Sequence, residues 1–300
     1  MRRPPALVLP LLVLPITVCV QVACKRAAAP AANANAANVA AAPSATPNVE
    51  QVIGELAKHD QEEIRQNPDQ PTGYYNLANT FFAAGKYEEA AEQYRQVLRL
   101  DPRDAAAHFE LGQSLLRLDR AGEAARSFNE ALKLNPRLGE AHLELGDALR
   151  KLDKQQEAVA SYRRAAAAFE QEIKSAPKEA QRLRGRLADA HFRAGNALDR
   201  LGQWRESVRA YEQAARLNPN DADAHFNLGY AHSRLEQFDA SLAAYRRAAE
   251  LRPDDAETHR RLALLHLLRD DLAAAQAEYD RVKSLDPKLA ATLAEHFARR

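Results

Sequence analysis

Histidine is the side chain in this sequence that could most readily bind a metal ion. Histidines recur at intervals of 34 or 49 residues, as His108, His142, His191, His225 and His259. Imidazoles on neighbouring helices would be roughly 8–10 Å apart, which is too far for them to share an ion. His225 and His232 are seven residues apart, about 10.5 Å along a helix, whereas paired ligands on one helix need a spacing of four. We therefore expect structural histidines and predict neither a metal nor a cofactor.

Nucleophilic and acid–base chemistry has no better candidates. The sequence contains no HExxH, no phosphate-binding glycine loop and no Gly-x-Ser-x-Gly motif. The two cysteines, Cys19 and Cys24, lie near the N-terminus, where they suit neither a catalytic dyad nor a zinc cluster. The carboxylates are scattered over solvated faces and do not form an acid–base pair. We predict that the protein is not an enzyme.

The composition predicts an all-α protein. Aromatic residues make up 6% of the 300 residues, there are only 11 glycines, and alanine and leucine dominate the 46% hydrophobic fraction. Strong helix formers are abundant, whereas the β-branched and aromatic residues that strands prefer are scarce. Lys and Arg number 42 against 41 Asp and Glu, a net charge of +1, so no overall field attracts nucleic acid.

Residues 1–23 have the pattern of a secretory signal peptide. A short basic start precedes an uncharged, mostly apolar run over residues 6–23, which prolines interrupt too often for a comfortable transmembrane helix. The pair Ala23-Cys24 resembles the end of a bacterial lipoprotein signal. That resemblance implies cleavage before Cys24, acylation of its thiol and amino group, and a membrane-anchored lipoprotein that faces the periplasm. Ordinary cleavage and an uncleaved anchor are the alternatives.

Residues 24–47 follow as an Ala/Pro/Asn-rich tether. Between Ala27 and Thr46 alanine predominates, no charged residue occurs, and Pro30 and Pro43 interrupt any helix. No apolar face exists for such a helix to bury. We expect a flexible, disordered spacer between the membrane and the folded part. A disordered end without a role is equally compatible with these residues.

From residue 71 onward the chain repeats itself. The segments LANTFFAAGKYEEAAEQYRQVLRLDP, LGQSLLRLDRAGEAARSFNEALKLNP and LGYAHSRLEQFDASLAAYRRAAELRP are variants of one sequence. Aligned on their first residue, the copies begin at Leu77, Leu111, Leu145, Ala194, Leu228 and Leu262, with steps of 34, 34, 49, 34 and 34 residues. The spacing, the Leu-Gly pair and the recurring proline resemble the tetratricopeptide repeat (TPR) family. The resemblance places repeats 1–3 within 71–172 and repeats 4–6 within 188–289, as 71–104, 105–138, 139–172, 188–221, 222–255 and 256–289.

Each repeat has the pattern of two short helices joined by a turn. Apolar residues fall at helical spacing on both sides of the turn, as Leu111, Leu115 and Phe128 show in the second repeat. Proline ends the second helix because it lacks an amide hydrogen, and aspartates such as Asp104 can cap the next repeat. Helices of this length are marginal alone, so neighbouring repeats must stabilise one another. The TPR resemblance implies an α-solenoid of six helical hairpins in a right-handed superhelix.

Three segments outside the repeats are also predicted to be helical. Residues 48–70 and 290–300 have apolar residues at helical spacing and are expected to cap the two ends. Residues 173–187 are an insertion; because Glu170 stands where other repeats have proline, the preceding helix should continue to about Pro177. The insertion is basic, with Lys174, Lys178, Arg182, Arg184 and Arg186 against Glu179. A basic contact surface for anionic partners or lipid is one interpretation, and a solvated helical face is the other.

In the TPR family the first helices of the repeats line a concave groove. The resemblance implies that positions 2, 5, 6, 9, 12 and 13 of each repeat face into it. At positions 5, 6, 9 and 13 this sequence supplies aromatic rings, amides and a basic row. The predicted partner-binding groove consists of Tyr75, Asn76, Asn79, Phe109, Arg117, Lys151, Phe192, Asn196, Arg200, Phe226, Asn227 and Arg234. Such a surface suits an extended or helical peptide with acidic character. Ordinary consensus residues without a dedicated site are the alternative.

A more specific ligand does not follow from these residues. Asn196, Asn227 and Arg261 resemble the TPR subgroup that holds a C-terminal carboxylate. Phe192 and Glu257 stand where that subgroup has lysines, so its specificity is not assigned. We predict a non-enzymatic scaffold that binds protein or peptide partners and assembles a complex at the bacterial cell envelope. A periplasmic glycan or small-ligand binder and an accessory subunit of an envelope enzyme are the alternatives.

Overall fold

The structure is a computed structural model that describes residues 49–298. The predicted signal peptide, the predicted tether and Cys24 lie outside these described residues. Within the described range, every helix is too short or too polar to cross a bilayer.

Residues 49–298 form α-helices, one short 3-10 helix and no strand, which confirms the all-α prediction. In chain order the helices are α2 (Val49–Gln66), α3 (Pro71–Ala83), α4 (Tyr87–Leu100), α5 (Ala105–Arg117), α6 (Ala121–Leu134), α7 (Gly139–Lys151), α8 (Gln155–Ser175), η1 (Pro177–Glu179), α9 (Ala180–Arg200), α10 (Trp204–Leu217), α11 (Ala222–Arg234), α12 (Phe238–Leu251), α13 (Ala256–Leu268), α14 (Leu272–Leu285) and α15 (Pro287–Ala298).

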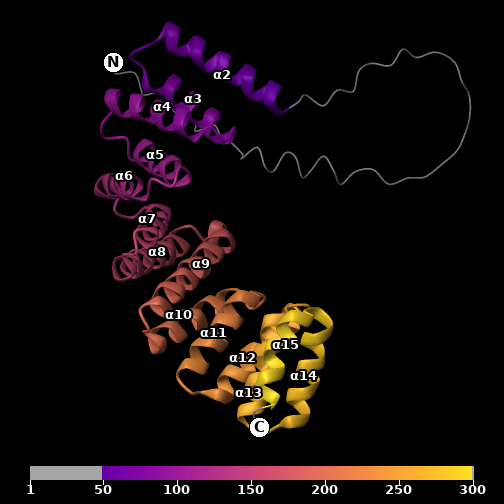
Figure 1. Cartoon of the computed structure of the whole chain (residues 1–300). Helices are drawn as coiled ribbons and strands as arrows, with labels where there is room; N and C mark the ends of the chain where they lie inside the picture. The colour runs from indigo at the N-terminus through magenta and orange to yellow at the C-terminus, as the bar shows by residue number, and fades with distance from the viewer. Residues whose placement is uncertain (1–48, 299–300) are drawn as a thin grey trace, which may run out of the picture. The chain divides into compact units, whose positions relative to one another are not determined.

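Helices α3 to α14 form six successive hairpins (Figure 1). The two helices of each hairpin, such as α3 with α4 and α5 with α6, pack against each other, and the second helix of each hairpin contacts the first helix of the next. The predicted solenoid of six helical hairpins is therefore confirmed. Because no hairpin buries its apolar face alone, each depends on its neighbours for stability.

A glycine in the first helix and an aromatic ring in the second fit together in four of the hairpins. A Cβ atom on any of these glycines would lie less than 3.0 Å from the ring. The pairs are Gly112–Phe128, Gly146–Tyr162, Gly195–Tyr211 and Gly229–Tyr245. All four rings are fully buried. The glycine therefore lets the two helix axes approach closely enough for the ring to fill the space between them.

The helix ends follow the predicted capping chemistry. Helices α4, α6, α10 and α12 each end two residues before a proline. The carboxylate of Asp104 accepts a hydrogen bond from the amide of Ala107, and the carboxylate of Asp221 accepts one from Ala224. Each aspartate thus occupies one of the backbone donors that the start of a helix leaves free.

Every hairpin turn contains one residue in the left-handed backbone region. Two of these residues are glycines and four carry side chains; they are Gly85, Asp119, Asp153, Gly202, Glu236 and Asp270. The φ angle is +58° at Glu236, a conformation that costs a residue with a Cβ atom roughly 1–2 kcal/mol. These turns therefore hold strain that glycine would relieve.

Replacing Glu236 with glycine is expected to raise the free energy of unfolding by about 0.5–1 kcal/mol. The relief of backbone strain exceeds the entropy that glycine adds to the unfolded chain. Denaturant-induced unfolding followed by circular dichroism measures the change. Glu236→Ala retains the Cβ atom and should give no comparable gain; an equal gain in both variants would contradict the assignment to backbone strain.

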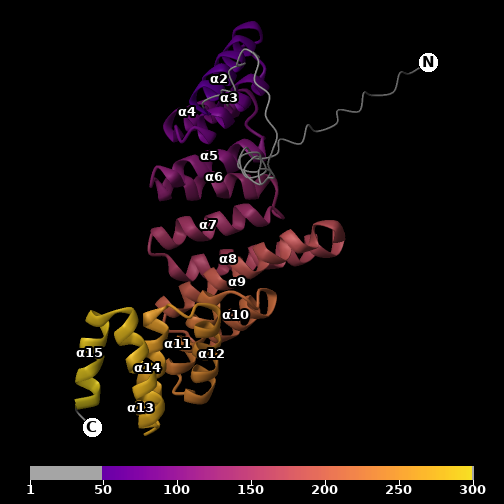
Figure 2. The ribbon, with the colours of Figure 1, turned by 90° about the vertical axis from the view of Figure 1, so that its right-hand side faces the viewer.

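The fifteen-residue insertion lengthens two helices. Helices α8 and α9 have 21 residues each, and η1 joins them. Figure 2 shows their joined ends extending beyond the neighbouring hairpins. Two of the predicted basic residues are paired here, since Arg182 binds Glu179 at 3.1 Å and Arg186 binds Glu140 of α7. Part of the predicted basic surface is therefore neutralised within the protein.

Helices α2 and α15 pack against the first and last hairpins. The side chain of Ile64 in α2 lies directly over Gly73 of α3. Leu293 of α15 is buried, and the ring of Phe297 lies 5.2 Å from that of Tyr279 in α14. Both contacts cover apolar surface that an outermost hairpin would otherwise expose.

Candidate functional site

All twelve predicted groove residues lie on the first helices of the first five hairpins. We call the side of these helices that carries the predicted residues, together with the charged residues beside them, the first-helix surface. The predicted residues are Tyr75, Asn76 and Asn79 on α3, Phe109 and Arg117 on α5, Lys151 on α7, Phe192, Asn196 and Arg200 on α9, and Phe226, Asn227 and Arg234 on α11. The four aromatic side chains and the amides of α9 and α11 are half-buried, whereas the remaining residues are exposed.

The aromatic residues of this surface pack largely within their own hairpins. The ring of Tyr75 lies 5.7 Å from that of Tyr94, and the ring of Phe226 lies 5.3 Å from that of Tyr245, both edge to face. Phe109 and Phe192 make equivalent contacts with the aromatic rings of α6 and α10. Burial raises the pKa of Tyr75 to about 12. These rings therefore offer a ligand one partly open face.

Two of the predicted amides already bind buried tyrosines. The hydroxyl of Tyr94 donates to Oδ1 of Asn79 at 2.6 Å, and the hydroxyl of Tyr211 donates to Oδ1 of Asn196 at 2.7 Å. The amide of Asn227 donates to that same oxygen of Asn196 at 3.4 Å, which joins α9 to α11. The acceptor oxygens are thus occupied, and the NH₂ group of Asn196 is left for a ligand.

The predicted basic row is only partly available. Lys151 forms an ion pair with Asp119 at 2.5 Å, and the guanidinium of Arg234 lies 4.4 Å from the ring of Trp204. Within the described range, no carboxylate lies within 4.0 Å of Arg117 or Arg200. Arg117 and Arg200 are therefore the cations of this row with neither an ion pair nor an aromatic contact among the described residues, whereas Arg234 lacks an ion pair there but stacks on Trp204.

The sequence analysis missed the carboxylates of the first-helix surface. Arg193 of α9 forms ion pairs with Asp147 of α7 and with Asp189, the latter at 2.8 Å. Burial raises the pKa of the neighbouring Glu144. Opposite charges at positions 6 and 9 of successive repeats were the signal that could have found this network. The surface carries both signs, so a partner must match a pattern of charges rather than a uniform basic strip.

Glu110 of α5 is a half-buried carboxylic acid on this surface. Its burial raises the pKa from 4.5 to about 7. A raised pKa means that the folded state binds this proton more tightly than the unfolded state does. The corresponding loss of stability is absent below about pH 4.5, grows as the pH rises, and is complete above about pH 7.

Glu110→Gln is expected to stabilise the protein at pH 8 and to have little effect at pH 4. The gain should be on the order of 1–2 kcal/mol at the higher pH, after solvent screening is allowed for. Urea unfolding of both proteins across this pH range measures the difference. A constant difference between the two proteins at all pH values would contradict the raised pKa.

The recurring histidines bind the backbone of the preceding repeat. Nε2 lies 3.0–3.2 Å from the carbonyl oxygen six residues earlier in each of four cases: His108 with Pro102, His142 with Pro136, His225 with Pro219 and His259 with Pro253. His191 follows the insertion, where no such proline stands. These imidazoles have the structural role that was expected for them, because each satisfies a carbonyl that the proline turn leaves free.

One side-chain group in the described range could approach the geometry of a metal site. Ligand atoms of His59, Asp60 and Glu63 lie within 4.8 Å of one another on α2. Asp60 already accepts a hydrogen bond from the hydroxyl of Thr80 at 2.9 Å. His59 is exposed, and no other feature of the described residues around it points to a bound ion. We therefore assign no metal to the group.

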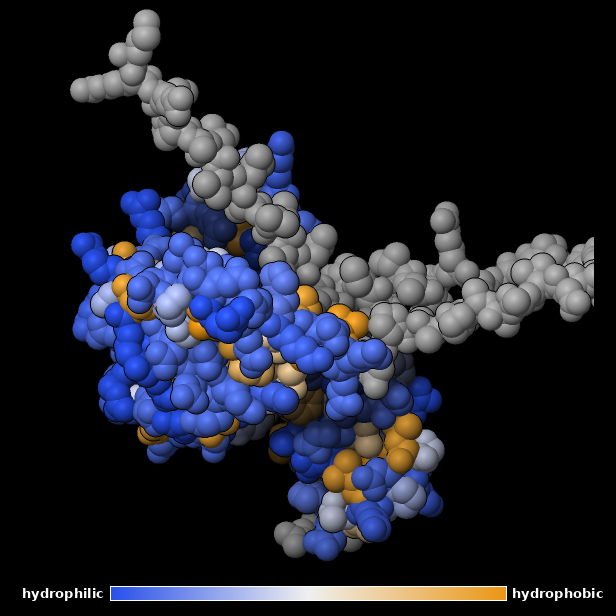
Figure 3. Space-filling model, turned by 90° about the horizontal axis from the view of Figure 1, so that it is seen from above, coloured by the Kyte–Doolittle hydropathy of each residue, from blue (hydrophilic) through white to orange (hydrophobic). Residues whose placement is uncertain are grey.

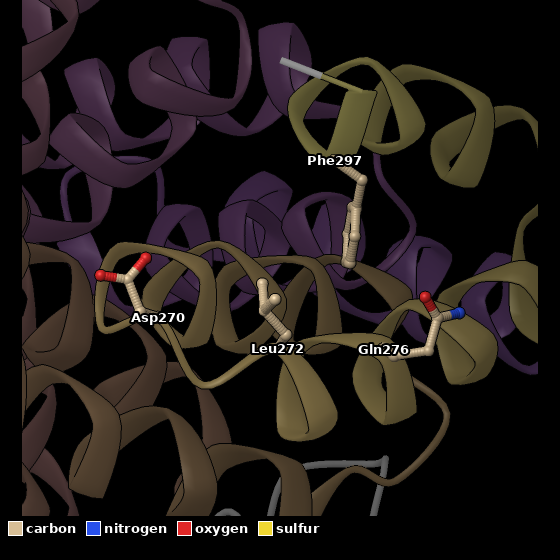
Figure 4. Close-up of a pocket in the computed structure, with 4 residues that line it drawn as sticks. All are labelled: Asp270, Leu272, Gln276 and Phe297. Atoms are coloured by element: carbon tan, nitrogen blue, oxygen red, sulfur yellow. The ribbon is translucent and has the colours of Figure 1, made fainter. Parts of the chain in front are cut away.

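The recesses of the described surface are shallow. One of about 470 Å³ lies between α7 and α9 and is lined by Asp147, Arg193, Asn196 and Arg200. Another of about 650 Å³ lies at the last hairpin, where Leu272 and Phe297 project into the same space (Figure 4). Figure 3 shows a mostly hydrophilic face on which hydrophobic side chains form small groups. The first recess joins the first-helix surface, and its polar lining suits a polar or charged group rather than a buried cofactor.

Sequence models of known families match both halves of the repeat region. Tetratricopeptide repeat models match residues 75–138, 111–172 and 222–255, and a TPR repeat model matches residues 195–236. Together they span more than half of the chain. The chain belongs to the tetratricopeptide repeat family. A search of curated proteins finds no match.

Solved structures of TPR proteins share the fold. A TPR repeat-containing protein from Cytophaga hutchinsonii is 13% identical with a TM-score of 0.65, covering 81% of this chain and 94% of its own. YrrB, described as a TPR protein with an unusual peptide-binding site, is 23% identical with a TM-score of 0.55, covering 72% and 100%. PilF of Pseudomonas aeruginosa is 18% identical with a TM-score of 0.56, covering 77% and 97%.

Membership of the TPR family and this fold support a protein-interaction scaffold. TPR proteins bind protein or peptide partners, and the fold is typically non-catalytic. The fold by itself names no partner, because binding specificity depends on the side chains that a fold carries.

Proposed function

We propose that this TPR protein binds a peptide segment of a protein partner on its first-helix surface and so assembles a complex at the bacterial cell envelope. The observation that carries the proposal is the combination of unpaired cations and a free amide on the first helices of repeats 2 and 4, α5 and α9. Arg117 and Arg200 lack a carboxylate within 4.0 Å in the described range, and the NH₂ group of Asn196 lines the same recess as Arg200. Guanidinium and amide donors suit the carboxylates and carbonyls of a peptide.

The proposed partner segment carries acidic residues that alternate with uncharged ones. Arg117 and Arg200 attract carboxylates, while Asp147 and Glu144 between them repel a continuous acidic run. The half-exposed rings of Phe109 and Phe192 supply apolar contacts beside the cations. The peptide-binding site named for YrrB shows that a protein of this fold can hold a peptide.

The Arg117→Glu and Arg200→Glu double variant is expected to weaken partner binding at least tenfold, because two attractions become repulsions. The partner is first captured from native envelopes by crosslinking, and its affinity is then measured with purified components. Arg209→Glu with Arg246→Glu, on exposed positions of the second helices, is the matched control. Equal loss of binding in both double variants would contradict a specific first-helix site.

The proposed envelope location depends on the N-terminal cysteine. We expect Cys24→Ser to abolish incorporation of labelled fatty acid and to release the protein from the membrane fraction. Ala23→Gly, which keeps a small residue before the cysteine, serves as the control. Retention of the Cys24→Ser protein in membranes without fatty acid would contradict lipid anchoring at this residue.

A further inference from the structure

Repeat 5 breaks a hydrogen-bonding rule that repeats 1, 3 and 4 obey. In three hairpins, a buried tyrosine hydroxyl donates to an Asn or Asp fifteen residues earlier: Tyr94 to Asn79, Tyr162 to Asp147 and Tyr211 to Asn196. In repeat 5 the residue fifteen before Tyr245 is Tyr230, not an amide or a carboxylate. The Tyr245 side chain is 1% exposed, and among residues 49–298 its hydroxyl has no hydrogen-bond partner. A buried polar group without a partner destabilises the hairpin.

Tyr230, the residue that breaks the rule, belongs to a cluster of aromatic rings and guanidinium groups from three repeats. Its ring meets that of Trp204 edge to face at 5.8 Å. The guanidinium of Arg234 lies 4.4 Å from the Trp204 ring, and that of Arg261 lies 5.7 Å from the Tyr230 ring. We call Trp204, Tyr230, Arg234 and Arg261 the Arg–aromatic cluster. Cation–π contacts of this kind hold each guanidinium in one orientation.

The cluster has an unpaired cation. Arg234 donates to the hydroxyl of Tyr230 at 3.2 Å, and in the part of the chain that the structure describes no carboxylate lies within ion-pair distance of it. Arg261 is bound to Glu257 at 2.8 Å. Burial raises the pKa of Asp199, and the positive charge of Arg234 acts against that shift. Most N–H groups of the Arg234 guanidinium are therefore free to bind a ligand. The contacts with Trp204 and Tyr230 hold them in position before a ligand binds.

We infer that the Arg–aromatic cluster is a recognition site for the side-chain carboxylate of a Glu or Asp residue in the partner. This inference rests on the proposed function and names one contact of it. A guanidinium binds a carboxylate through two parallel hydrogen bonds, and Trp, Tyr and Arg are the residues that dominate binding energy at protein interfaces. Arg234 is exposed, so the site is open on its outer side and can accept a side chain of a passing segment.

The broken hydrogen bond and the cluster have one explanation. Asparagine at position 230 would give the Tyr245 hydroxyl the acceptor that Asn79 and Asn196 provide elsewhere, but it would remove the ring that positions Arg234 and Arg261. The tyrosine therefore favours binding at the expense of stability. A position where the sequence departs from such a structural rule and gains no stability marks a functional residue.

Tyr230→Asn should consequently raise the melting temperature while weakening the binding of an acidic peptide at least fivefold, because it restores the hydrogen bond and removes the cluster's central ring. A merely structural Tyr230 would lose stability together with binding. Tyr245→Phe removes a hydroxyl without a partner and should leave the melting temperature unchanged or raise it. A lower melting temperature in both variants would overturn the explanation.

The probe is a short peptide of alternating Glu and Gln residues, acetylated and amidated at its ends, and the full-length protein reports on it through Trp204, the only tryptophan in the sequence. We expect a saturable change in tryptophan emission, a loss of at least about tenfold in affinity in Arg234→Gln, and no loss in the control Arg209→Gln. A matched amidated poly-glutamine peptide should not respond. A second poly-glutamine peptide, with a free C-terminus, tests whether the site binds a chain end instead. The inference is overturned if only that peptide changes the tryptophan emission, or if Arg234→Gln binds the acidic peptide as tightly as the unchanged protein does.

The native partner separates this inference from the proposed function. If Arg117→Glu with Arg200→Glu abolishes binding of the captured partner but Arg234→Gln does not, the first-helix surface stands and the carboxylate site at the cluster is wrong. If neither set of variants affects the captured partner, the proposed function itself fails. Loss of binding in both sets supports both.

Discussion

Gly146→Ala should destabilise the protein by about 1–3 kcal/mol, although alanine is the better helix former. The added Cβ atom would lie less than 3.0 Å from the ring of Tyr162, which is fully buried and cannot move aside. Its hydroxyl is also fixed by a hydrogen bond to Asp147 at 2.7 Å. The two helices of the third hairpin must separate, and the loss should spread to the hairpins on either side.

The same substitution at another helical glycine gives the control. Gly185 lies within α9, and a Cβ atom there would meet no atom within 4 Å. Gly185→Ala should therefore stabilise the protein by roughly 0.5–1 kcal/mol through helix propensity. Thermal and urea unfolding of the two variants should shift in opposite directions. Two shifts of the same sign would show that the glycine–tyrosine fit does not hold the hairpin together.

Arg193→Leu should have the second large effect, a loss of about 2–4 kcal/mol. Its guanidinium joins Asp147 on α7 to Asp189 on α9 and so links repeat 3 to repeat 4 across the insertion. Burial opposes the charge of Arg193, yet its hydrogen bond with Asp189 and the charge of Asp147 outweigh that effect and raise the pKa. Leucine would leave these two partly buried carboxylates, beside Glu144, with only the longer ion pairs to Arg150 at 3.6 Å and Arg186 at 3.9 Å.

A double-mutant cycle with Asp147→Asn isolates the ion pair. Asparagine keeps the Oδ1 atom that accepts the hydrogen bond of Tyr162, but it removes the charge that Arg193 compensates. The combined variant should therefore lose less stability than the sum of the two single losses, by about 1 kcal/mol or more. Additive losses would indicate that Arg193 stabilises the junction by packing alone.

The period of 34 residues was sufficient to predict the hairpins, their turns and the proline stops. It has this power because every copy must bury the same face against its neighbours, so the same residue types recur. The aspartate caps followed from the same reasoning. The left-handed turn residues could not be predicted in this way, because Asp119 and Glu236 occupy positions where backbone geometry favours glycine.

The candidate site was harder to predict than the fold. The residues of the first-helix surface were placed on the correct helices, but Asn79 and Asn196 were assigned to a ligand while their oxygens bind buried tyrosines. That role depends on the tyrosine fifteen residues later in the second helix. The network around Arg193 also escaped, because each position was considered by residue type rather than against the charges of the next repeat. A contact between two repeats depends on one particular residue in each of them. A consensus pattern describes each repeat separately and therefore does not predict such contacts.

The central claim is that a partner docks on the first-helix surface, and site-specific photocrosslinking tests it most directly. A photoreactive amino acid is placed at Asn76 or Arg200 on the first helices, or at Arg209 or Arg246 on exposed positions of the second helices. We predict that the first two positions crosslink to the partner in native envelopes and that the other two do not. Crosslinks from Arg209 and Arg246 with none from Asn76 and Arg200 would contradict the account.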